Sequence, residues 1–376
     1  MNTVRISLSG MNGNKIRVYA ASLGGGSFNI YQVNEFKVDI QGDYYELLVF
    51  TKSNRIVPDD IKSILPGDAM MNISAGKSSK LISMRTSKEI PQKTQKQISN
   101  APGIDQLIFI SPVLPIISGN ETEVPFSTIS SLLDYAEKGN YSLGDIGIIY
   151  EKCLSGLPEA GLITQMREII SLIDKSIQTG LQGTEYKDRI LHQQSHLIEE
   201  AEKNNKILQG SVVNSIIAYV TAIMEAKSAL EVFVANPTAG SCGTIGGVIK
   251  AIAEELKSTE EEVVQSYFAA GMVGAYFAAG PGFSAEEHGC QVECGAASGM
   301  AAAAIVQLFG GTARQAIDAS SMAIQNMIGL ICDPVADRVE VPCLGKNINA
   351  AVNAYSSAIM ACSGYKAVIP LDEVIE

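Results

Sequence analysis

The amino-acid sequence predicts an α+β protein in which a small N-terminal sheet domain precedes a large all-α domain. Two textures along the chain support this prediction. Up to about Ser111, short runs rich in Val, Ile, Tyr and Phe alternate with turn pairs, which is typical of strands. From Ser127 onward, apolar residues recur at helical spacing. We therefore expect a sheet domain over residues 1–111, a proline-containing linker over residues 112–126, and an all-helical domain over residues 127–376.

The sheet domain is expected to contain a ferredoxin-like βαββαβ unit. The runs with strand character are Val4–Leu8, Lys15–Ala21, Asn29–Ile40, Tyr44–Thr51, Lys80–Met84 and Gln106–Ile110. Between the later runs lie two helical patterns, Pro58–Leu65 and Pro91–Asn100. With one further short strand near Met70–Ile73, the order from Tyr44 onward is strand, helix, strand, strand, helix, strand. That order defines the unit.

The second domain is expected to be built from helices that pack closely. Helical spacing occurs in Ser127–Lys138, Ser142–Leu154, Ile163–Thr179, Tyr186–Asn204, Ser211–Leu230 and Ile245–Leu256. Thr259 and Glu262 form a capping box, which predicts another helix start. The alanine- and glycine-rich run Gly295–Ala304 predicts a helix whose backbone neighbours can approach closely.

An uncharged stretch, Gln265–Ala285, is long enough to span a bilayer. Pro281 inside it and the acidic pair Glu286-Glu287 after it favour a buried helix and a turn instead. The chain has 28 Lys+Arg against 40 Asp+Glu and a net charge of −12, which argues against nucleic-acid or anionic-membrane partners. The first residues lack the pattern of a secretory signal, and seven unevenly spaced cysteines do not form a disulfide framework. We expect a cytoplasmic protein.

Three cysteines are candidate metal ligands. Cys290, Cys332 and Cys343 each stand beside Gly or Pro at an expected break between helices, whereas Cys153 and Cys362 are typical of a core. Thiol ligands in a cytosolic protein favour zinc or an iron–sulfur cluster. Zinc sites usually contain close Cys-x2-Cys pairs, and the nearest spacing here is Cys290-x3-Cys294. Spacing alone leaves open whether a metal binds at all.

The glycine-rich segment Ala235–Gly247 precedes an expected helix start near Ile245. Backbone N–H groups and the positive end of the helix dipole at such a place can bind a carboxylate or a phosphate. The segment lacks the P-loop pattern, and an ordinary turn before a helix explains it equally well.

Four motifs follow one another in the helical domain: Asn236-Pro-Thr-Ala-Gly-Ser-Cys-Gly243, Gly289-Cys-Gln291, Gly329-Leu-Ile-Cys-Asp-Pro-Val335 and Val341-Pro-Cys343 with Asn347. In order and spacing they resemble the catalytic α-domain of iron–sulfur-dependent L-serine dehydratases, over roughly Ser127–Glu376. The first domain is similar to the ACT-type domain of that family's β-subunit, through Ser22–Phe28 and Val33–Val38.

The resemblance implies a fold, a cofactor and a reaction. Cys290, Cys332 and Cys343 would hold a [4Fe–4S] cluster. An open iron would act as a Lewis acid while serine, or a similar small β-substituted amino acid, loses water by α,β-elimination to give a 2-oxo acid and ammonia. The residues implied to bind substrate are Asn236, Thr238, Gly240, Ser241, Gln291, Asn326 and Asn347. The internal candidates for the acid or base are His288 and Lys346.

The chain departs from the family's pattern in ways that keep alternatives open. No cysteine follows Cys362, although the family has a fourth one near its C-terminus, and the Ser-His-Thr segment of the β-domain is absent. A cysteine desulfidase that releases sulfide is one alternative. Another is a cluster-binding subunit whose partner supplies the base, so the expected assembly is a homodimer or a heteromer with a β-type subunit. His192 and His196 have the spacing of a metal pair but are expected on a solvated helix surface.

Overall fold

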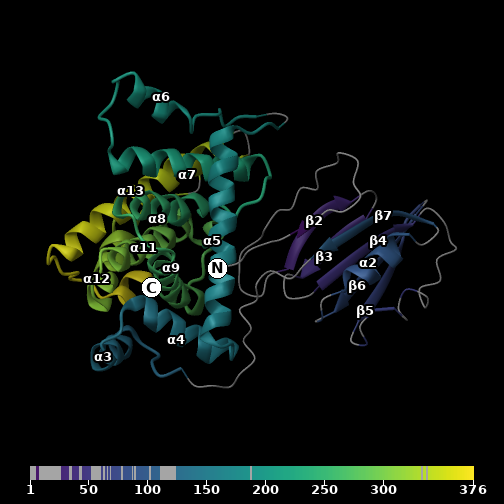
Figure 1. The fold of residues 1–376 in the computed structure, drawn as a ribbon, viewed down its shortest axis with the longest axis horizontal. Helices are drawn as coiled ribbons and strands as arrows, with labels where there is room; N and C mark the ends of the chain where they lie inside the picture. The colour runs from purple at the N-terminus through teal and green to yellow at the C-terminus, as the bar shows by residue number, and fades with distance from the viewer. Residues whose placement is uncertain are drawn as a thin grey trace. The chain divides into compact units, whose positions relative to one another are not determined.

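A computed structural model describes residues 6–7, 27–33, 36–41, 45–51, 61, 64–65, 67, 69–77, 79–86, 88, 90–100, 103–110, 124–186, 189–331, 333–335 and 338–376. The chain divides into two compact units. Thr3–Pro115 makes up one, and the other contains Ile116–Glu376. Antiparallel sheets dominate the described part of the first and helices the second, so the protein is α+β as predicted (Figure 1).

The first unit contains a five-stranded antiparallel sheet and a separate two-stranded one. The larger sheet has the strand order β1-β7-β4-β6-β5, and β2 pairs with β3. One described helix, α2 (Gln92–Ser99), belongs to this unit. The strands are β1 (Ile6–Ser7), β2 (Ser27–Val33), β3 (Phe36–Gln41), β4 (Tyr45–Thr51), β5 (Met70–Ala75), β6 (Lys80–Thr86) and β7 (Ile104–Ile110).

The central strand, β4, is buried on both faces. On one face Leu47 and Val49 pack in an apolar cluster with Ile98 of α2. On the other face the ring of Phe50 lies 6.0 Å from that of Phe36 in β3. Successive residues of a strand point to opposite faces, so a strand covered on both sides carries a continuous apolar run, here Leu47 to Phe50. Leu48 accordingly has no exposed surface.

Most predicted strands of this unit occur within a residue or two of their expected bounds. The strand inserted near Met70–Ile73 is present as β5. The prediction of one strand over Asn29–Ile40 is wrong: the chain reverses there, and β2 pairs with β3 from Ser27 opposite Gln41 to Val33 opposite Phe36. The predicted strand at 15–21 lies outside the described residues, as does most of the predicted helix at 58–65, of which position 61 is helical.

The helical unit is arranged around α11, whose neighbours are α8, α9, α12 and α13 (Figure 1). Small residues permit this packing: a Cβ on Gly299 of α11 would lie 2.6 Å from Ile324 of α12. The helices are α3 (Ile129–Gly139), α4 (Leu143–Ser155), α5 (Glu159–Gln182), α6 (Leu197–Lys203), α7 (Val212–Ser228), α8 (Cys242–Leu256), α9 (Glu260–Ala279), α10 (Ala285–His288), α11 (Cys290–Leu308), α12 (Ala313–Gln325), α13 (Glu340–Cys362) and α14 (Leu371–Ile375).

Two predictions about α9 are confirmed. The Thr259–Glu262 capping box opens this helix, with both reciprocal hydrogen bonds present. The uncharged stretch that begins at Gln265 is a largely buried helix followed by a turn. Over the described residues, no helix combines the length and the apolar character needed to cross a membrane.

The predicted helix at Tyr186–Asn204 is wrong in its first half, since among the described residues of that range only Leu197–Lys203 is helical. The buried carboxylate of Glu225 in α7 explains the difference. It accepts hydrogen bonds from the backbone N–H groups of Gln194 and Ser195, at 2.5 and 3.1 Å, and from the Ser195 hydroxyl at 2.9 Å. Those N–H groups are therefore unavailable to a helix, and the two histidines do not share a helix face.

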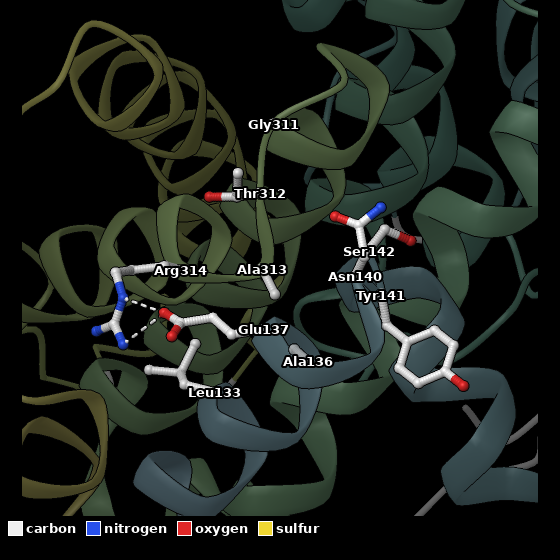
Figure 2. A pocket seen from close by; sticks show the side chains of 10 residues that line it. All are labelled: Leu133, Ala136, Glu137, Asn140, Tyr141, Ser142, Gly311, Thr312, Ala313 and Arg314. Atoms are coloured by element: carbon white, nitrogen blue, oxygen red, sulfur yellow. Dashed lines mark hydrogen bonds and ion pairs between the residues drawn. The ribbon is translucent and has the colours of Figure 1, made fainter.

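A pocket of about 460 Å³ opens between the α3–α4 connection and the start of α12 (Figure 2). The Arg314 guanidinium pairs with the Glu137 carboxylate at 3.1 Å on its wall. None of the predicted site residues lines this pocket. Its lining residues from Gly311 to Arg314 follow the last turn of α11, at the opposite end of that helix from Cys290.

Candidate active site

The starts of three helices come together in the centre of the helical unit: α8, α11 and α13. Asn347 of α13 is hydrogen-bonded to the first turn of α8, and Cys343 near the start of α13 lies close enough to Cys294 near the start of α11 to contribute to the raised pKa of its thiol. The α8 start is joined to α11 through Thr238. Each helix start carries partial positive charge, so their convergence favours bound anions and thiolates.

Asn347 joins two of these helices with every polar atom of its side chain. Its Oδ1 accepts from the N–H groups of Gly243 and Thr244, both at 3.1 Å, and from the Thr244 hydroxyl at 3.0 Å. Its Nδ2 donates to the carbonyls of Gly240 at 2.7 Å and Cys343 at 2.8 Å. The side chain therefore positions the backbone of the site.

The loop before α8 contains a buried amide with unused hydrogen-bonding capacity. Asn236, which precedes Pro237 through a cis peptide bond, has no exposed surface. Neither Nδ2 nor Oδ1 has a hydrogen-bond partner among the described residues. Burying such a group without a partner is costly, so an amide of this kind inside a polar loop indicates a place for a ligand.

Thr238, Ser241 and Glu293 form a buried hydrogen-bonded cluster. The Thr238 hydroxyl donates to Oε1 of Glu293 at 2.5 Å. The same Oγ1 accepts from the Ser241 N–H at 3.1 Å and lies 2.9 Å from the Ser241 Oγ. Ser241 Oγ accepts from the Thr238 N–H at 3.4 Å. The cluster ties the loop before α8 to the first turn of α11.

Gly240 lies flat against the Glu293 carboxylate. A Cβ at position 240 would be 2.3 Å from Oε1 and 2.7 Å from Oε2, closer than real atoms approach. Only a residue without a side chain leaves room for the carboxylate here. The glycine that the sequence places among the substrate-binding residues is thus required by its close neighbour on α11.

Among the described residues, four cysteines of this region are buried: Cys242, Cys290, Cys294 and Cys343. A hydrogen bond with Cys290, burial, and the nearby Glu293 and Cys343 raise the pKa of the Cys294 thiol well above its usual value. Burial raises the pKa of Cys242 to about 12, despite an opposing effect of Lys227.

Two members of the predicted ligand set, Cys290 and Cys343, are described and both are buried. The third, Cys332, lies outside the described residues. Over the described ranges, no three His, Cys, Asp or Glu side chains form a group that could hold a metal ion. The donor chemistry nevertheless fits an iron–sulfur group, because soft thiols gather where solvent is excluded.

Side chains beside the thiols hold the loop after α12. The Gln291 Oε1 accepts from the Gly329 N–H at 2.9 Å, and the Gln291 N–H donates to the Leu330 carbonyl at 2.8 Å. The Lys346 ammonium donates to the Ile331 carbonyl at 2.7 Å and pairs with the Asp333 carboxylate. Gln291 and Lys346 therefore brace the chain on either side of position 332.

The remaining predicted residues lie nearer the surface. The Asn326 amide is exposed and donates to Asn353 Oδ1 at 2.8 Å. His288, at the end of the short helix α10, is 44% exposed and lies 3.8 Å from the Glu287 carboxylate. Their roles in the site remain predictions.

The sequence reasoning missed Glu293. It is 8% exposed, whereas most acidic residues of the chain are on the surface. One signal could have identified it: it is the single charged residue in the alanine- and glycine-rich stretch Cys290–Leu308. A charge inside a helix buried on all sides needs a polar partner, and the partner here is Thr238.

Comparison with known proteins identifies the family. Residues 73–376 match the family described as "Serine dehydratase alpha chain". The "Probable L-serine dehydratase, alpha chain" of Bacillus subtilis is 34% identical over 251 residues, which cover 67% of this chain and 84% of the relative.

Two further relatives have similar names. The "L-serine dehydratase, alpha chain" of Peptoniphilus asaccharolyticus is 29% identical over 66% of this chain and 86% of its own. "L-serine dehydratase 1" of Escherichia coli is 29% identical over 69% of this chain and 59% of its own. These matches confirm the resemblance read from the sequence motifs. The chain belongs to the serine dehydratase alpha chain family.

Proposed function

We propose that this chain is the catalytic alpha chain of an L-serine dehydratase, which eliminates water from L-serine to give an enamine whose hydrolysis, with uptake of one water, releases ammonia and leaves pyruvate. The observation that carries the proposal is the convergence of buried thiols and a buried polar loop at the starts of α8, α11 and α13. The names of the relatives support the same substrate and reaction.

Cys290, Cys332 and Cys343 would hold a [4Fe–4S] cluster, and the group, when bound, supplies a Lewis acid for the oxygens of the substrate. The chain's own residues provide the surroundings. Three helix starts direct partial positive charge towards the site, which favours the substrate's carboxylate. The Asn236 amide has donor capacity for the same group. Burial of the loop excludes water from the reacting atoms.

The acid or base is assigned to His288 among the two candidates. Lys346 donates to the Ile331 carbonyl and pairs with the Asp333 carboxylate, so two of its three donors hold the loop. His288 stands at the end of α10, immediately before the start of α11, and its imidazole reaches solvent for proton exchange.

The N-terminal unit is assigned to the ACT type. If β4, β5, β6 and β7 are numbered 1 to 4 along the chain, their order in the sheet is 4-1-3-2, and neighbouring strands are antiparallel. This order supports a ferredoxin-like unit. A docking or dimerisation role suits this unit.

The "alpha chain" names of relatives support a separate β-type partner, and the absence of a Ser-His-Thr segment agrees with such a partner. The expected location is the cytoplasm.

Anaerobic purification tests the proposal. We expect a brown protein that contains about four iron and four sulfide per chain and shows the visible absorption of an iron–sulfur cluster. Pyruvate should form from L-serine, alone or after addition of a second chain. Cys343→Ser should lose most of the iron, whereas Cys153→Ser, at a thiol far along the chain from the site, should retain it.

A colourless wild-type protein without iron would refute the cofactor. Release of sulfide from L-cysteine without pyruvate from L-serine would instead assign a desulfidase. An iron-loaded chain that stays inert until a partner is added would assign the role of a cluster-binding subunit.

A further inference from the structure

The hydroxyl groups of Thr238 and Ser241 are fully occupied within the protein. A hydroxyl offers one proton and two lone pairs. The Thr238 proton is directed to Oε1 of Glu293, and its oxygen accepts from the Ser241 N–H. The remaining contact, 2.9 Å between the two hydroxyl oxygens, then requires that the Ser241 hydroxyl be its donor. Neither hydroxyl retains a proton for a ligand.

This result changes which groups can recognise a substrate. The carboxylate of an amino acid needs donors, and Thr238 and Ser241 have none left while Glu293 is ionised. The buried Asn236 amide has donors to give. The hydroxyl pair instead fixes the Glu293 carboxylate in one orientation. Gly240 packs against the same carboxylate.

Glu293 presents negative charge at the place where the loop before α8 meets the thiols. Glu293 is 8% exposed, and its charge contributes to the raised pKa values of both Cys242 and Cys294. The Glu293 carboxylate accepts a hydrogen bond from the Thr238 hydroxyl, which holds it in place. In a dry site such a group attracts a cation far more strongly than it would in water.

We propose that Glu293 binds the α-ammonium group of the substrate, with Thr238 as the positioning residue that orients its carboxylate. The inference rests on the proposed function, since it names the subsite that makes an α-amino acid the substrate. An ammonium supplies three donors, and its charge-assisted bond to a carboxylate is about twice as strong as a neutral one. Hydroxy acids, which lack the ammonium, gain nothing from Glu293.

The test compares two unreactive ligands that differ only in the ammonium: L-alanine and propanoate. Calorimetric titration of the anaerobic holoenzyme measures both dissociation constants, with L-serine turnover measured alongside. Glu293→Gln keeps the shape and an acceptor for Thr238 but removes the charge. We expect it to weaken L-alanine binding by about 10- to 100-fold and to leave propanoate within about twofold. The KM for L-serine should rise more than kcat falls.

Two further variants separate this role from a structural one. Glu293→Asp keeps the charge and should retain part of the preference for L-alanine, which also serves if the Gln variant does not fold. Glu261→Gln removes the charge of a 71% exposed glutamate on α9 and should change neither constant.

Equal weakening of both ligands by Glu293→Gln would overturn the inference, because only a structural role predicts it. Unchanged L-alanine binding with a large fall in kcat would also overturn it and would make Glu293 a proton carrier. A wild-type enzyme that binds no amino acid and forms no pyruvate would refute the proposed function itself, which is a different outcome from either.

Discussion

At the scale of single residues, the site depends on atoms that have no space to move. The Glu293 carboxylate rests against Gly240 on one side and receives the Thr238 hydroxyl on another. Neither a glycine nor a threonine is unusual in a loop before a helix, and only the family resemblance places both among the expected substrate-binding residues. Their importance comes from the carboxylate of α11 that lies against them.

Gly240→Ala tests this close approach. Its Cβ would stand 2.3 Å from Oε1 of Glu293, so either the loop or the carboxylate must shift. We expect the free energy of unfolding to fall by about 1–3 kcal/mol, the usual effect of overpacking, and the KM for L-serine to rise. Urea denaturation and steady-state kinetics measure the two effects.

Gly271→Ala is the matched control for that substitution. Gly271 lies within α9, and a Cβ there meets no atom within 4 Å. Alanine is the better helix former, so this variant should gain up to about 1 kcal/mol. If both substitutions were equally harmless, Gly240 would not be confined by Glu293.

At the scale of secondary-structure elements, α8 and α13 are joined by one amide. Asn347 accepts at the first turn of α8 and donates to the Gly240 and Cys343 carbonyls, and it has no exposed surface. The exposed helix starts of most proteins are capped from their own loop. Here the cap of α8 comes from another helix, so the two helices cannot be placed independently.

Asn347→Ala should therefore destabilise the protein more than a typical asparagine substitution. It leaves buried N–H and carbonyl groups of two helices without partners, and we expect a loss of about 2–4 kcal/mol of unfolding free energy. Asn349→Ala, two residues further along α13 at an exposed position, should cost less than about 1 kcal/mol. Chemical denaturation of both variants gives the comparison, and similar losses would contradict the bridging role.

At the scale of the whole molecule, the division into two units predicts which elements lose stability when a cluster is removed. Cys290 and Cys343 both belong to the unit that contains Ile116–Glu376, near the starts of α11 and α13. A group that binds the folded state alone stabilises it, so its removal loosens the elements that hold it.

Removal of iron with a chelator under air should thus speed amide hydrogen exchange in peptides from the starts of α8, α11 and α13. Peptides from β4 and β6 of the other unit should exchange as before. Hydrogen-exchange mass spectrometry of the same sample before and after treatment measures both. A uniform increase over the two units would show that they do not respond separately.

Local patterns predicted most of the fold. The capping box at Thr259 identified the start of α9, and strand-like runs located β4, β6 and β7. The pattern failed where distant groups intervened. Helical spacing between Tyr186 and Leu197 was overridden by the buried carboxylate of Glu225, which lies thirty residues away from the backbone groups it captures.

Spacing, caps and motifs are local properties of the chain, and from them the α+β class, the family and the residue types of the site could be predicted. How those residues act depends on the packing of the helices. Thr238 and Glu293 are 55 positions apart, and Gly243 and Asn347 are 104 apart. Helix packing brings each pair into hydrogen-bond distance. A hydroxyl proton that is donated within the protein is no longer available to a ligand, and a sequence motif does not show which protons are donated in this way.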